Sequence, residues 1–312
     1  MRSNGIAVDT VFVDCLKDTC LPIDKCRIEG KTRVFSISPV QYTIAFKQYY
    51  LDFLAAWTEA RFDAEHAIGI NVNSLEWTVL ACKLNTYSNG IMAGDYKNFG
   101  PGLSLNSVRD AFDAILEWYS VHDPDLERML IRKVLACEII NGSHMAGNLL
   151  YHVTSGIPSG SPITTPLNSI VNSLYIRYAW IGITQLTLDV FTQNVILVTY
   201  GDDLVLSVSP MYVDIFNIKT ISDYFLKFDI VFTSDTKGEI CDGSRTLSDV
   251  SFLKHKFTPY RDIYLAEPVI ESLSKCINWI HKKGDITVAT VENAKQCLEL
   301  AFGKGKQYYD NL

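Results

Sequence analysis

The chain has 312 residues, of which 48% are hydrophobic and 12% aromatic, and its formal net charge is −7 at pH 7. This length and composition suffice for the folded core of one large domain or two smaller ones, and they exclude an intrinsically disordered chain. No run of about 18 uncharged apolar residues is present, so no membrane span is expected, and the acidic balance by itself argues against nucleic-acid binding.

The first half of the chain combines helical patterns with one short apolar run. Apolar residues at three- and four-residue spacing, or helix-start signals, predict helices over 42–61, 74–84, 104–119 and 124–141. The apolar run 90–94 predicts a buried strand that ends at Asp95.

The second half mixes helices with strands, which predicts an α+β fold. Two β-branched runs, 195–200 and 204–208, are separated only by Gly201, Asp202 and Asp203, and they are therefore predicted to form a hairpin. The other expected elements are a loop at 158–162, helices over 164–182 and 211–226, a strand at 229–233, a hairpin-like stretch at 250–257 and helical structure beyond 268.

The sharpest local feature is the string Tyr200-Gly201-Asp202-Asp203 at the tip of the predicted hairpin. Adjacent carboxylates repel each other, and Mg²⁺ relieves that repulsion because it prefers carboxylate oxygen and keeps positions open for phosphate. Antiparallel pairing with the strand that ends at Asp95 would bring Asp95 next to Asp202 and form a cage for two cations. The alternative for these residues is an ordinary turn in solvent.

Two further regions carry groups that suit a nucleotide. Thr164 and Asn168 are four residues apart, so they share one helix face and can present hydrogen-bonding groups to a sugar. The alternative is a hydroxyl-rich first helical turn, which N-capping preferences alone would produce. A cluster of cations suits a triphosphate and consists of Lys17, Lys25, Arg27, Lys31 and Arg33. The alternative is that these residues belong to an ordinary solvated loop.

Other kinds of site find no support in the sequence. The 8 cysteines and 6 histidines show no spacing typical of a zinc site or a catalytic triad. The string Gly30-Lys31-Thr32 is similar to the end of a P-loop, but that motif requires a glycine where Lys25 stands, and no apolar strand leads into it.

These features also occur in a characteristic order. Along the chain stand Lys17-Asp18, Gly30-Lys31-Thr32-Arg33, Asp95-Tyr96, Pro158-Ser159-Gly160 with Thr164 and Asn168, Tyr200-Gly201-Asp202-Asp203, Lys227 and Phe252-Leu253-Lys254. This order resembles motifs F, A, B, C, D and E of the RNA-dependent RNA polymerases of picorna-like positive-strand RNA viruses, over about residues 15–258. The string at 95–102 is more similar to that of arthropod picorna-like viruses, the dicistroviruses and iflaviruses.

The resemblance implies a right-hand polymerase fold with an antiparallel palm sheet, and RNA-directed RNA polymerase activity in viral genome replication and transcription. It places fingers with motif F at 1–90, palm with motif A at 91–119, fingers again at 120–157, palm with motifs B to E at 158–258, and the start of a thumb at 259–312. We further expect the chain to be a core fragment cut from a polyprotein.

The resemblance also implies a role for each site residue. Asp95, Asp202 and Asp203 would hold two Mg²⁺ ions, for which Mn²⁺ can substitute, and Lys227 would protonate the leaving pyrophosphate. The nucleotide-binding residues would be Lys17, Lys25, Lys31, Arg33, Ser159, Gly160, Thr164 and Asn168, with Gly160 as the hinge of a mobile loop. The primer grip would be Phe252, Leu253 and Lys254.

The implied partners are an RNA template, the nascent RNA strand, ribonucleoside triphosphates, a small viral protein primer and other replication proteins. The implied location is the host cytoplasm, at membrane-associated replication complexes. The acidic net charge is weaker evidence than this resemblance, because the cations expected to bind the nucleotide are concentrated between Lys17 and Arg33.

The chain departs from the family pattern at two residues and in its spacing, since the interval from Lys25 to Lys31 and the position of Lys227 are each about one residue off. Gly100 stands where picornaviral enzymes carry an aspartate that selects ribose, so ribose selection is expected to depend on Ser159, Thr164 and Asn168, or on a displaced side chain such as Asn98. Leu21 stands four residues after Lys17, where the enzymes of this family often carry an arginine. Two rival hypotheses are a reverse transcriptase, which would require a bulky residue in place of Gly100, and a non-catalytic palm-fold binding module, which would have lost a metal aspartate.

Overall fold

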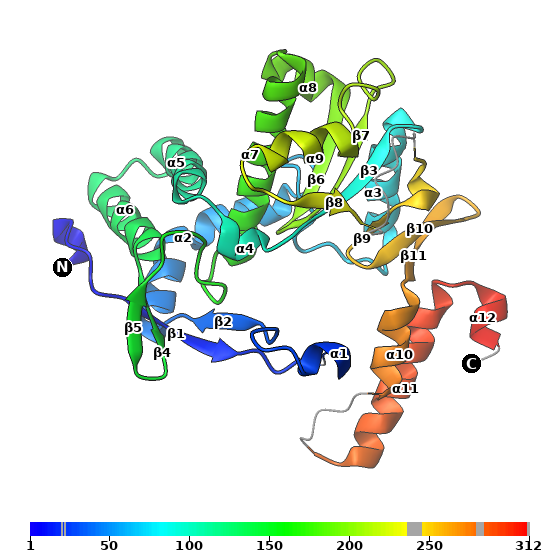
Figure 1. The fold of residues 1–312 in the computed structure, drawn as a ribbon, viewed down its shortest axis with the longest axis horizontal. Coiled ribbons are helices and arrows are strands. Elements are labelled where there is room, and N and C mark those ends of the chain that lie inside the picture. Colours follow the sequence, from blue (N-terminus) through cyan, green and yellow to red (C-terminus); the bar gives the residue numbers. More distant parts are fainter. Residues whose placement is uncertain (20, 22, 236–244, 279–283, 311–312) are drawn as a thin grey trace. The chain divides into compact units, whose positions relative to one another are not determined.

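The computed structural model describes residues 1–19, 21, 23–235, 245–278 and 284–310 (Figure 1). The chain divides into two compact units. The first unit comprises Met1–Ala64, Asn98–Tyr175 and Tyr200–Asp202, and the second comprises Glu65–Lys97, Ile176–Thr199 and Asp203–Leu312.

The first unit contains a four-stranded sheet in the order β2-β1-β4-β5 (Figure 1). Its strands are β1 (Val11–Leu16), β2 (Val34–Ile37), β4 (Ser143–Ala146) and β5 (Leu149–His152). Strand β1 pairs antiparallel with β2 and parallel with β4, while β4 and β5 are antiparallel. Sequence analysis did not predict this sheet, because its strands are short and most of their side chains are not fully buried.

Three long helices form the core of the first unit. They are α2 (Val40–Glu59), α5 (Leu105–His122) and α6 (Leu126–Ile140), and they confirm three of the helices that the apolar spacing predicted. The buried face of α2 includes Phe46 and Tyr50, whose rings stack with centroids 4.2 Å apart. Aromatic side chains of this size contribute most of the apolar area that such a helix buries.

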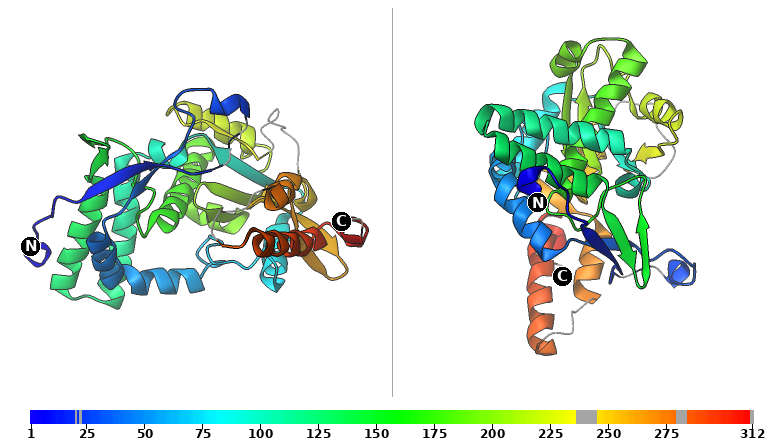
Figure 2. Two further views of the ribbon diagram at one scale, coloured as in Figure 1. Left: turned by 90° about the horizontal axis from the view of Figure 1, so that it is seen from below. Right: turned by 90° about the vertical axis from the view of Figure 1, so that its left-hand side faces the viewer.

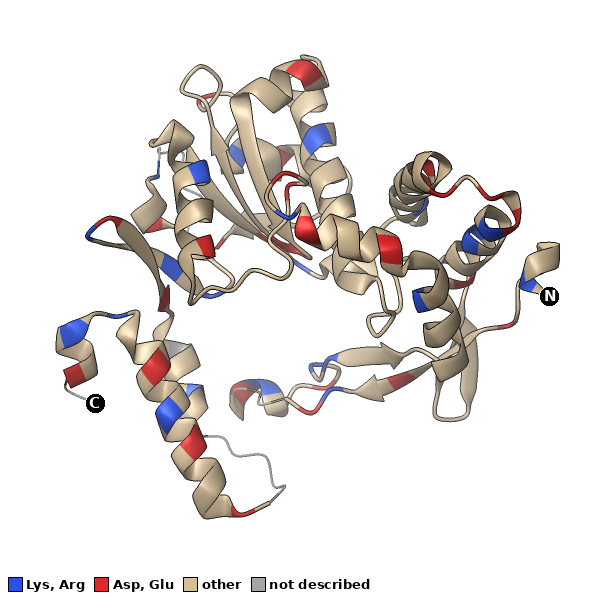
Figure 3. Cartoon of the chain, turned by 180° about the vertical axis from the view of Figure 1, so that it is seen from behind, with Lys and Arg blue, Asp and Glu red and all other residues tan. Residues whose placement is uncertain are grey.

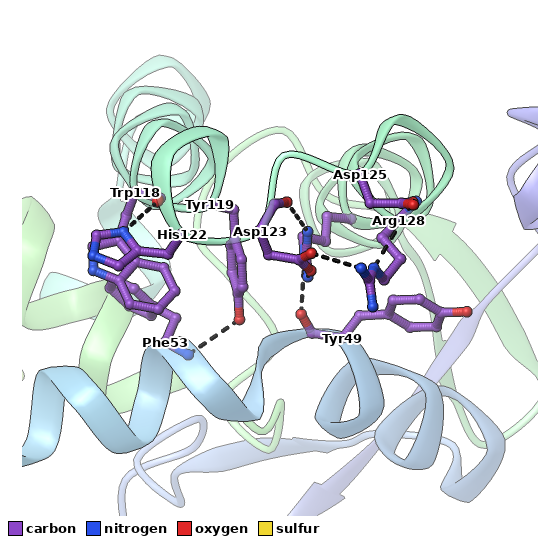
Figure 4. Close-up of polar contacts among 9 residues, drawn as sticks. Tyr49, Phe53, Trp118, Tyr119, His122, Asp123, Asp125 and Arg128 are labelled. Atoms are coloured by element: carbon purple, nitrogen blue, oxygen red, sulfur yellow. Dashed lines mark hydrogen bonds and ion pairs between the residues drawn. The ribbon is translucent and has the colours of Figure 1, made fainter.

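Polar contacts join the same three helices (Figure 4). The Tyr119 hydroxyl of α5 accepts a hydrogen bond from the Phe53 amide of α2. Arg132 of α6, only 2% exposed, forms an ion pair with Asp123 and donates to the Tyr49 carbonyl. The guanidinium also lies 3.6 Å from the centroid of the Tyr119 ring, so this buried charge is fully compensated.

Short helices and one very long helix complete the first unit. The short ones are η1 (Arg2–Asn4), α1 (Ile23–Cys26) and α4 (Phe99–Gly102). Helix α7 (Thr164–Thr184) begins in the first unit and continues into the second. It confirms the helix that was expected from residue 164 onwards.

The second unit contains an antiparallel sheet in the order β6-β7-β3-β8. Its strands are β3 (Ile91–Tyr96), β6 (Val195–Tyr200), β7 (Asp203–Val208) and β8 (Phe232–Ser234). The expected hairpin is confirmed, and its turn is tighter than expected, because β7 already begins at Asp203. Strand β8 lies later than the predicted 229–233, since Asp229 takes a positive φ of 59° in a turn.

A second sheet of three strands, in the order β11-β10-β9, follows in the same unit. Its strands are β9 (Ser251–Phe252), β10 (His255–Tyr260) and β11 (Ile263–Pro268). The hairpin-like pattern at 250–257 therefore marks only part of a larger meander. Mixed helices and largely antiparallel sheets confirm the predicted α+β class.

The helices of the second unit are α3 (Leu75–Leu84), η2 (Asn85–Tyr87), α8 (Leu188–Asn194), α9 (Ile218–Leu226), η3 (Leu247–Asp249), α10 (Ile270–Asn278), α11 (Ile286–Phe302) and α12 (Lys306–Asp310). Helices α10 and α11 lie side by side in every view (Figures 1 and 2). Throughout the described ranges, no helix is both long enough and apolar enough to cross a membrane.

The helix predicted over 211–226 begins only at Ile218. Asn217 caps it with a reciprocal pair of bonds: the Thr220 amide donates to the Asn217 side chain at 3.1 Å, and the Asn217 amide donates to the Thr220 hydroxyl at 3.0 Å. Such a capping box fixes a helix start, which is why the apolar pattern before Asn217 does not continue it.

Candidate active site

Two of the predicted aspartates lie at the end of the β3–β7 pairing in the second unit. Strands β3 and β7 pair antiparallel with Gly94 opposite Leu204, so Asp95 and Asp203 occupy the next position in the same register. Both side chains are half-buried. Sequence analysis expected Asp95 next to Asp202, whereas this register places the following residue, Asp203, opposite Asp95. Directly opposed residues project from the same face of a sheet.

The donor set at this strand end fits a magnesium ion. Carboxylate oxygens are the hard ligands that Mg²⁺ prefers, and Mg²⁺ is commonly held by one or two protein carboxylates together with phosphate and water. Within the part of the chain that the structure describes, no group of three or more His, Cys, Asp or Glu side chains forms a complete protein cage. A carboxylate pair of this kind suits a metal that a nucleotide also helps to hold.

The turn before β7 is anchored to helix α7 within the first unit. The Gly201 amide donates to the Ser169 hydroxyl at 2.7 Å. The Asn172 amide nitrogen donates to the carbonyls of Gly201 at 3.0 Å and of Asp202 at 3.2 Å. Gly201 takes a positive φ of 64°, which a two-residue hairpin turn favours at its first position. The backbone that carries Asp202 is thus fixed, while the Asp202 side chain is exposed.

Sequence analysis missed Ser169 and Asn172. Both are at most 1% exposed, although they lie on a helix whose neighbouring positions are largely apolar. Their spacing of three residues places them on one helix face, and a pair of polar residues on an apolar face was the signal that could have identified them. Buried polar groups of this kind are almost always hydrogen-bonded.

The loop that carries the predicted ribose-sensing residues is attached to strand β2. The Ser159 hydroxyl accepts a hydrogen bond from the Ser36 amide at 3.1 Å, and the Gly160 amide donates to the Ser36 carbonyl at 2.9 Å. A Cβ atom added at Gly160 would lie 2.2 Å from that carbonyl oxygen. Glycine is required at this position because the two backbones approach so closely.

Thr164 and Asn168 differ in what their side chains do. The Thr164 hydroxyl bonds the carbonyls of Pro158 and Ser161 at 3.1 and 2.9 Å, so it stabilises the first turn of α7. The Asn168 Oδ1 atom is buried and has no hydrogen-bond partner among the described residues. Asn168 therefore retains the acceptor capacity that a bound sugar hydroxyl would satisfy.

A cavity of about 460 Å³ in the first unit brings these residues together. Ser159, Thr164 and Asn168 line it, and so does Gly100. A Cβ atom added at Gly100 would meet nothing within 4 Å, so the position leaves open space where a larger side chain would stand.

The four cations that were assigned to nucleotide binding lie in or beside the loop between β1 and β2, where both signs of charge occur (Figure 3). The Lys17 amide donates to the Arg33 carbonyl at 2.8 Å, which closes the loop at its base. The side chains of Lys17, Lys25, Lys31 and Arg33 are exposed. Counting only described residues, none of the four forms an ion pair, so their charges are available to an anion.

The remaining predicted residues lie in the second unit. Lys227 follows the last residue of α9, and its exposed ammonium lies 5.3 Å from the centroid of the Tyr224 ring. Phe252 is 2% exposed in β9, and Leu253 and Lys254 form the turn to β10 with positive φ values of 51° and 61°. Two such values in succession define a tight hairpin turn, which points the Lys254 side chain to solvent.

Comparisons with known proteins agree with this geometry. A family model described as "Viral RNA-dependent RNA polymerase" matches residues 1–312. The genome polyprotein of Deformed wing virus is 51% identical over 316 residues, which cover 99% of this chain and 11% of the polyprotein. The replicase polyproteins of Acute bee paralysis virus (strain Rothamsted) and Drosophila C virus (strain EB) are 34% and 31% identical, over 95% and 99% of this chain and 16% and 18% of their own lengths.

A solved structure shows the same fold. The Sicinivirus 3Dpol RNA-dependent RNA polymerase matches with a TM-score of 0.80 at 19% identity, over 99% of this chain and 63% of that one. The predicted right-hand polymerase fold is thereby confirmed. Because the family match extends over its whole length, the chain belongs to the viral RNA-dependent RNA polymerase family, as its resemblance to the enzymes of picorna-like viruses predicted.

Proposed function

We propose that the protein is an RNA-directed RNA polymerase, which joins ribonucleotides on an RNA template by two-metal-ion nucleotidyl transfer. The observation that carries the proposal is the register of β3 and β7, which sets Asp95 and Asp203 opposite each other. Asp202 precedes Asp203 in the Gly-Asp-Asp turn that characterises the family. The family match over residues 1–312 supports the same activity.

In this proposal Asp95, Asp202 and Asp203 hold two magnesium ions, for which manganese can substitute. Such ions, when bound, activate the attacking hydroxyl of the nascent strand and stabilise the charge of the leaving pyrophosphate. The contribution of the chain is to hold the carboxylates in place. The pairing of β3 with β7 ends one residue before Asp95 and begins one residue after Asp203, and hydrogen bonds with Ser169 and Asn172 hold the backbone of the turn.

The other site residues bind the incoming nucleotide and the primer. The exposed cations Lys17, Lys25, Lys31 and Arg33 neutralise its triphosphate. Lys227 donates a proton to the leaving pyrophosphate, for which an exposed ammonium on the end of a helix is suited. The turn formed by Phe252, Leu253 and Lys254 grips the primer.

Ribose is selected by the loop and helix that line the cavity. Ser159, Thr164 and Asn168 line it, Gly160 adjoins Ser159 in the chain, and the unpartnered Oδ1 atom of Asn168 is the acceptor best placed for a ribose hydroxyl. Gly100 has no side chain that could exclude a 2′-hydroxyl. That open position favours ribonucleotides and argues against a reverse transcriptase.

We also propose that residues 1–90 and 120–157 form the fingers, 91–119 and 158–258 the palm, and 259–312 the start of the thumb. The substrates would be an RNA template, the nascent RNA and ribonucleoside triphosphates. A small viral protein primer and other replication proteins would be partners in viral replication in the host cytoplasm. The chain spans 11% to 18% of the polyproteins compared above, so these functions are proposed for the longer protein that contains it.

The test is primer extension on a homopolymer RNA template with Mg²⁺. The parent protein should extend the primer with ribonucleotides and far less with deoxyribonucleotides. The Asp202→Asn variant should lose incorporation by about 10³-fold or more, because a carboxylate ligand of the ions is removed while the fold is retained.

The matched control is Asp214→Asn, which makes the same chemical change at an exposed aspartate before α9. It should extend the primer as the parent does. Extension by Asp202→Asn at the parent rate would refute the metal assignment, and a parent that uses deoxyribonucleotides equally well would refute the ribose-selecting role of Asn168.

A further inference from the structure

Each strand of the β2-β1-β4-β5 sheet contributes one polar side chain to a single cluster. The residues are Asp14 of β1, Ser36 of β2, His144 of β4 and Tyr151 of β5, and we call them the four-strand cluster. Asp14 pairs directly with Ser36, and His144 pairs directly with Tyr151. Side chains of directly paired residues lie on the same face of a sheet, so the register itself assembles the cluster.

Asp14 is the centre of the cluster. Its Oδ1 atom accepts a hydrogen bond from the Ser36 hydroxyl at 2.6 Å and lies 3.1 Å from His144 Nδ1, while its Oδ2 atom accepts from the Tyr151 hydroxyl. The Asp14 side chain is 5% exposed and that of His144 is 6% exposed. Carboxylates that accept several hydrogen bonds in a buried setting are held rigidly.

The electrostatics agree with an ionised Asp14. Burial opposes ionisation, but hydrogen bonds from Ser36, Tyr151 and His144 outweigh it and lower the pKa of the carboxyl below its ordinary value of 3.8. The hydrogen bond to Asp14 raises the pKa of Tyr151 to about 12, so that the phenol remains a donor.

Ser36 connects this cluster to the loop that carries Ser159 and Gly160. Its hydroxyl belongs to the cluster, while its backbone amide donates to the Ser159 hydroxyl and its carbonyl accepts from the Gly160 amide. The missing Cβ at Gly160 permits this contact. A shift of β2 would therefore move Ser159 and Gly160 with it.

The cluster and the loop also border the same space. Asp14, Ser36, His144 and Tyr151 line the cavity of about 460 Å³ that Ser159 and Asn168 line as well. His144 Nε2 is buried and, among the described residues, has no hydrogen-bond partner. The polar side chains of this cluster therefore stand beside the cavity, at positions where packing alone would favour apolar residues.

We propose that the four-strand cluster is a positioning device for the Ser159–Gly160 loop and thereby sets how strictly the cavity discriminates ribose from deoxyribose. Asp14 acts as a positioning residue, through Ser36, and need not touch the nucleotide. The inference rests on the proposed polymerase function. A loop that must read one hydroxyl group has to be held within a fraction of an ångström, and a rigid sheet can supply that support.

The experiment compares Asp14→Asn with the parent and with a matched control. Asp14→Asn keeps the shape but replaces one acceptor oxygen by a donor, so the cluster cannot satisfy all its bonds. Tyr151→Phe removes a single donor and is the milder second variant. The control is Glu138→Gln: Glu138 is equally buried in the same unit, accepts bonds from Arg2, Thr10 and the Val8 amide, and does not line the cavity.

Three measurements are made on each protein. Hydrogen exchange of the Gly160 amide reports how firmly the loop is held to Ser36, whether or not the protein is active. The ratio of kcat/KM for a ribonucleotide to that for the matching deoxyribonucleotide reports discrimination, and thermal unfolding reports stability.

Asp14→Asn should accelerate exchange at Gly160 and reduce discrimination, each by about tenfold, the effect of losing one hydrogen bond to a charged group. The change should appear mainly in KM for the ribonucleotide. Tyr151→Phe should give a smaller change in the same direction. Glu138→Gln should lower the unfolding temperature by a similar amount and leave both readouts at parent values.

The proposal is overturned if Asp14→Asn loses stability as Glu138→Gln does while exchange at Gly160 and discrimination stay unchanged. Faster exchange with unchanged discrimination would also overturn it, because the loop would then move without consequence for selection. A parent that incorporates no nucleotide at all would instead refute the proposed polymerase function, and Gly160 exchange would still decide whether the cluster anchors the loop.

Discussion

Two regions of the first unit are proposed to contact the nucleotide, and the fold holds them very differently. The Ser159–Gly160 loop and the Gly201–Asp202 turn are bonded through their backbones to β2 and α7. The cations between β1 and β2 are exposed, and among the described residues of their loop the Lys17 amide bonds the Arg33 carbonyl across its base. We call the Ser159–Gly160 loop and the Gly201–Asp202 turn together the anchored region, and the segment between β1 and β2 the cationic loop.

The difference follows from what each region must recognise. A ribose hydroxyl or a metal-bound oxygen is read by geometry, so its partners must stand at fixed positions. A triphosphate is read mainly by charge, and long flexible lysine side chains can follow it. Substitutions in the anchored region should therefore change both stability and selectivity, whereas substitutions in the cationic loop should change affinity alone.

Among the residues that hold the anchored region in place, the largest effect is expected at Asn172 of α7. Asn172→Ala removes two hydrogen bonds to the turn, of which the one to Gly201 is buried, and this should lower the free energy of unfolding by about 2 to 4 kcal/mol. Nucleotide incorporation should fall by about 10²-fold, because the backbone of Asp202 is no longer fixed. Urea unfolding and primer extension measure the two effects.

The control for Asn172 is Asn194→Ala, which removes one amide-to-carbonyl bond at the end of α8. It should cost some stability and leave incorporation unchanged. Equal incorporation by both variants would mean that the turn does not need its contacts with α7.

A somewhat smaller effect is expected at Gly160. Gly160→Ala places a methyl group 2.2 Å from the Ser36 carbonyl oxygen, so the loop and β2 must separate. The free energy of unfolding should fall by about 1 to 3 kcal/mol, as for other overpacked sites, and discrimination against deoxyribonucleotides should weaken. Gly102→Ala, where nothing lies within 4 Å, should be neutral in both measurements.

Single changes in the cationic loop should weaken binding without affecting the fold. Lys25→Ala should raise KM for ribonucleotides by about three- to tenfold and leave the unfolding temperature unchanged, because an exposed charge contributes little to stability. The difference from the parent should shrink as salt is raised from about 50 to 500 mM, since screening weakens exposed charge interactions. Lys25→Arg should behave as the parent. A loss of stability in Lys25→Ala would contradict the claim that the cationic loop, unlike the anchored region, affects affinity alone.

The smallest effect concerns pH. Because the folded pKa of Asp14 lies below its ordinary value of 3.8, its contribution to stability is present above that value and is lost as pH falls through the folded pKa. Asp14→Asn should therefore flatten the decline of the free energy of unfolding below about pH 4. Lys25→Ala should leave that decline unchanged. Urea unfolding from pH 5 down to pH 2 measures both slopes, and equal slopes in all three proteins would contradict the role of Asp14.

The sequence was sufficient to predict the elements whose signals are local. Short apolar runs and a tight turn predict the hairpin around Gly201 and the strand before Asp95. The two strands β3 and β7 pair antiparallel, as expected. Helices such as α2 and α6 were predicted because each has a complete apolar face and lies close to the predicted bounds.

The four-strand cluster could not be predicted for a physical reason. Pairing of β1 with β4 joins residues about 130 positions apart, as in the bond between Asp14 and His144, and no local pattern encodes such a partner. The role of Ser36 depends on that same pairing. Ser169 and Asn172 are different: their polar character on an apolar helix face was visible, but the turn that they bond is distant in the chain.

The central claim is that the aspartates at the ends of β3 and β7 hold the catalytic metal ions. It is tested most directly by electron paramagnetic resonance titration of Mn²⁺ with primed RNA and a non-hydrolysable ribonucleotide present. We predict two bound ions in the parent and in Asp214→Asn, and affinity weakened by about tenfold or more in Asp202→Asn and in Asp95→Asn. Unchanged Mn²⁺ affinity in both of the latter variants would contradict the account.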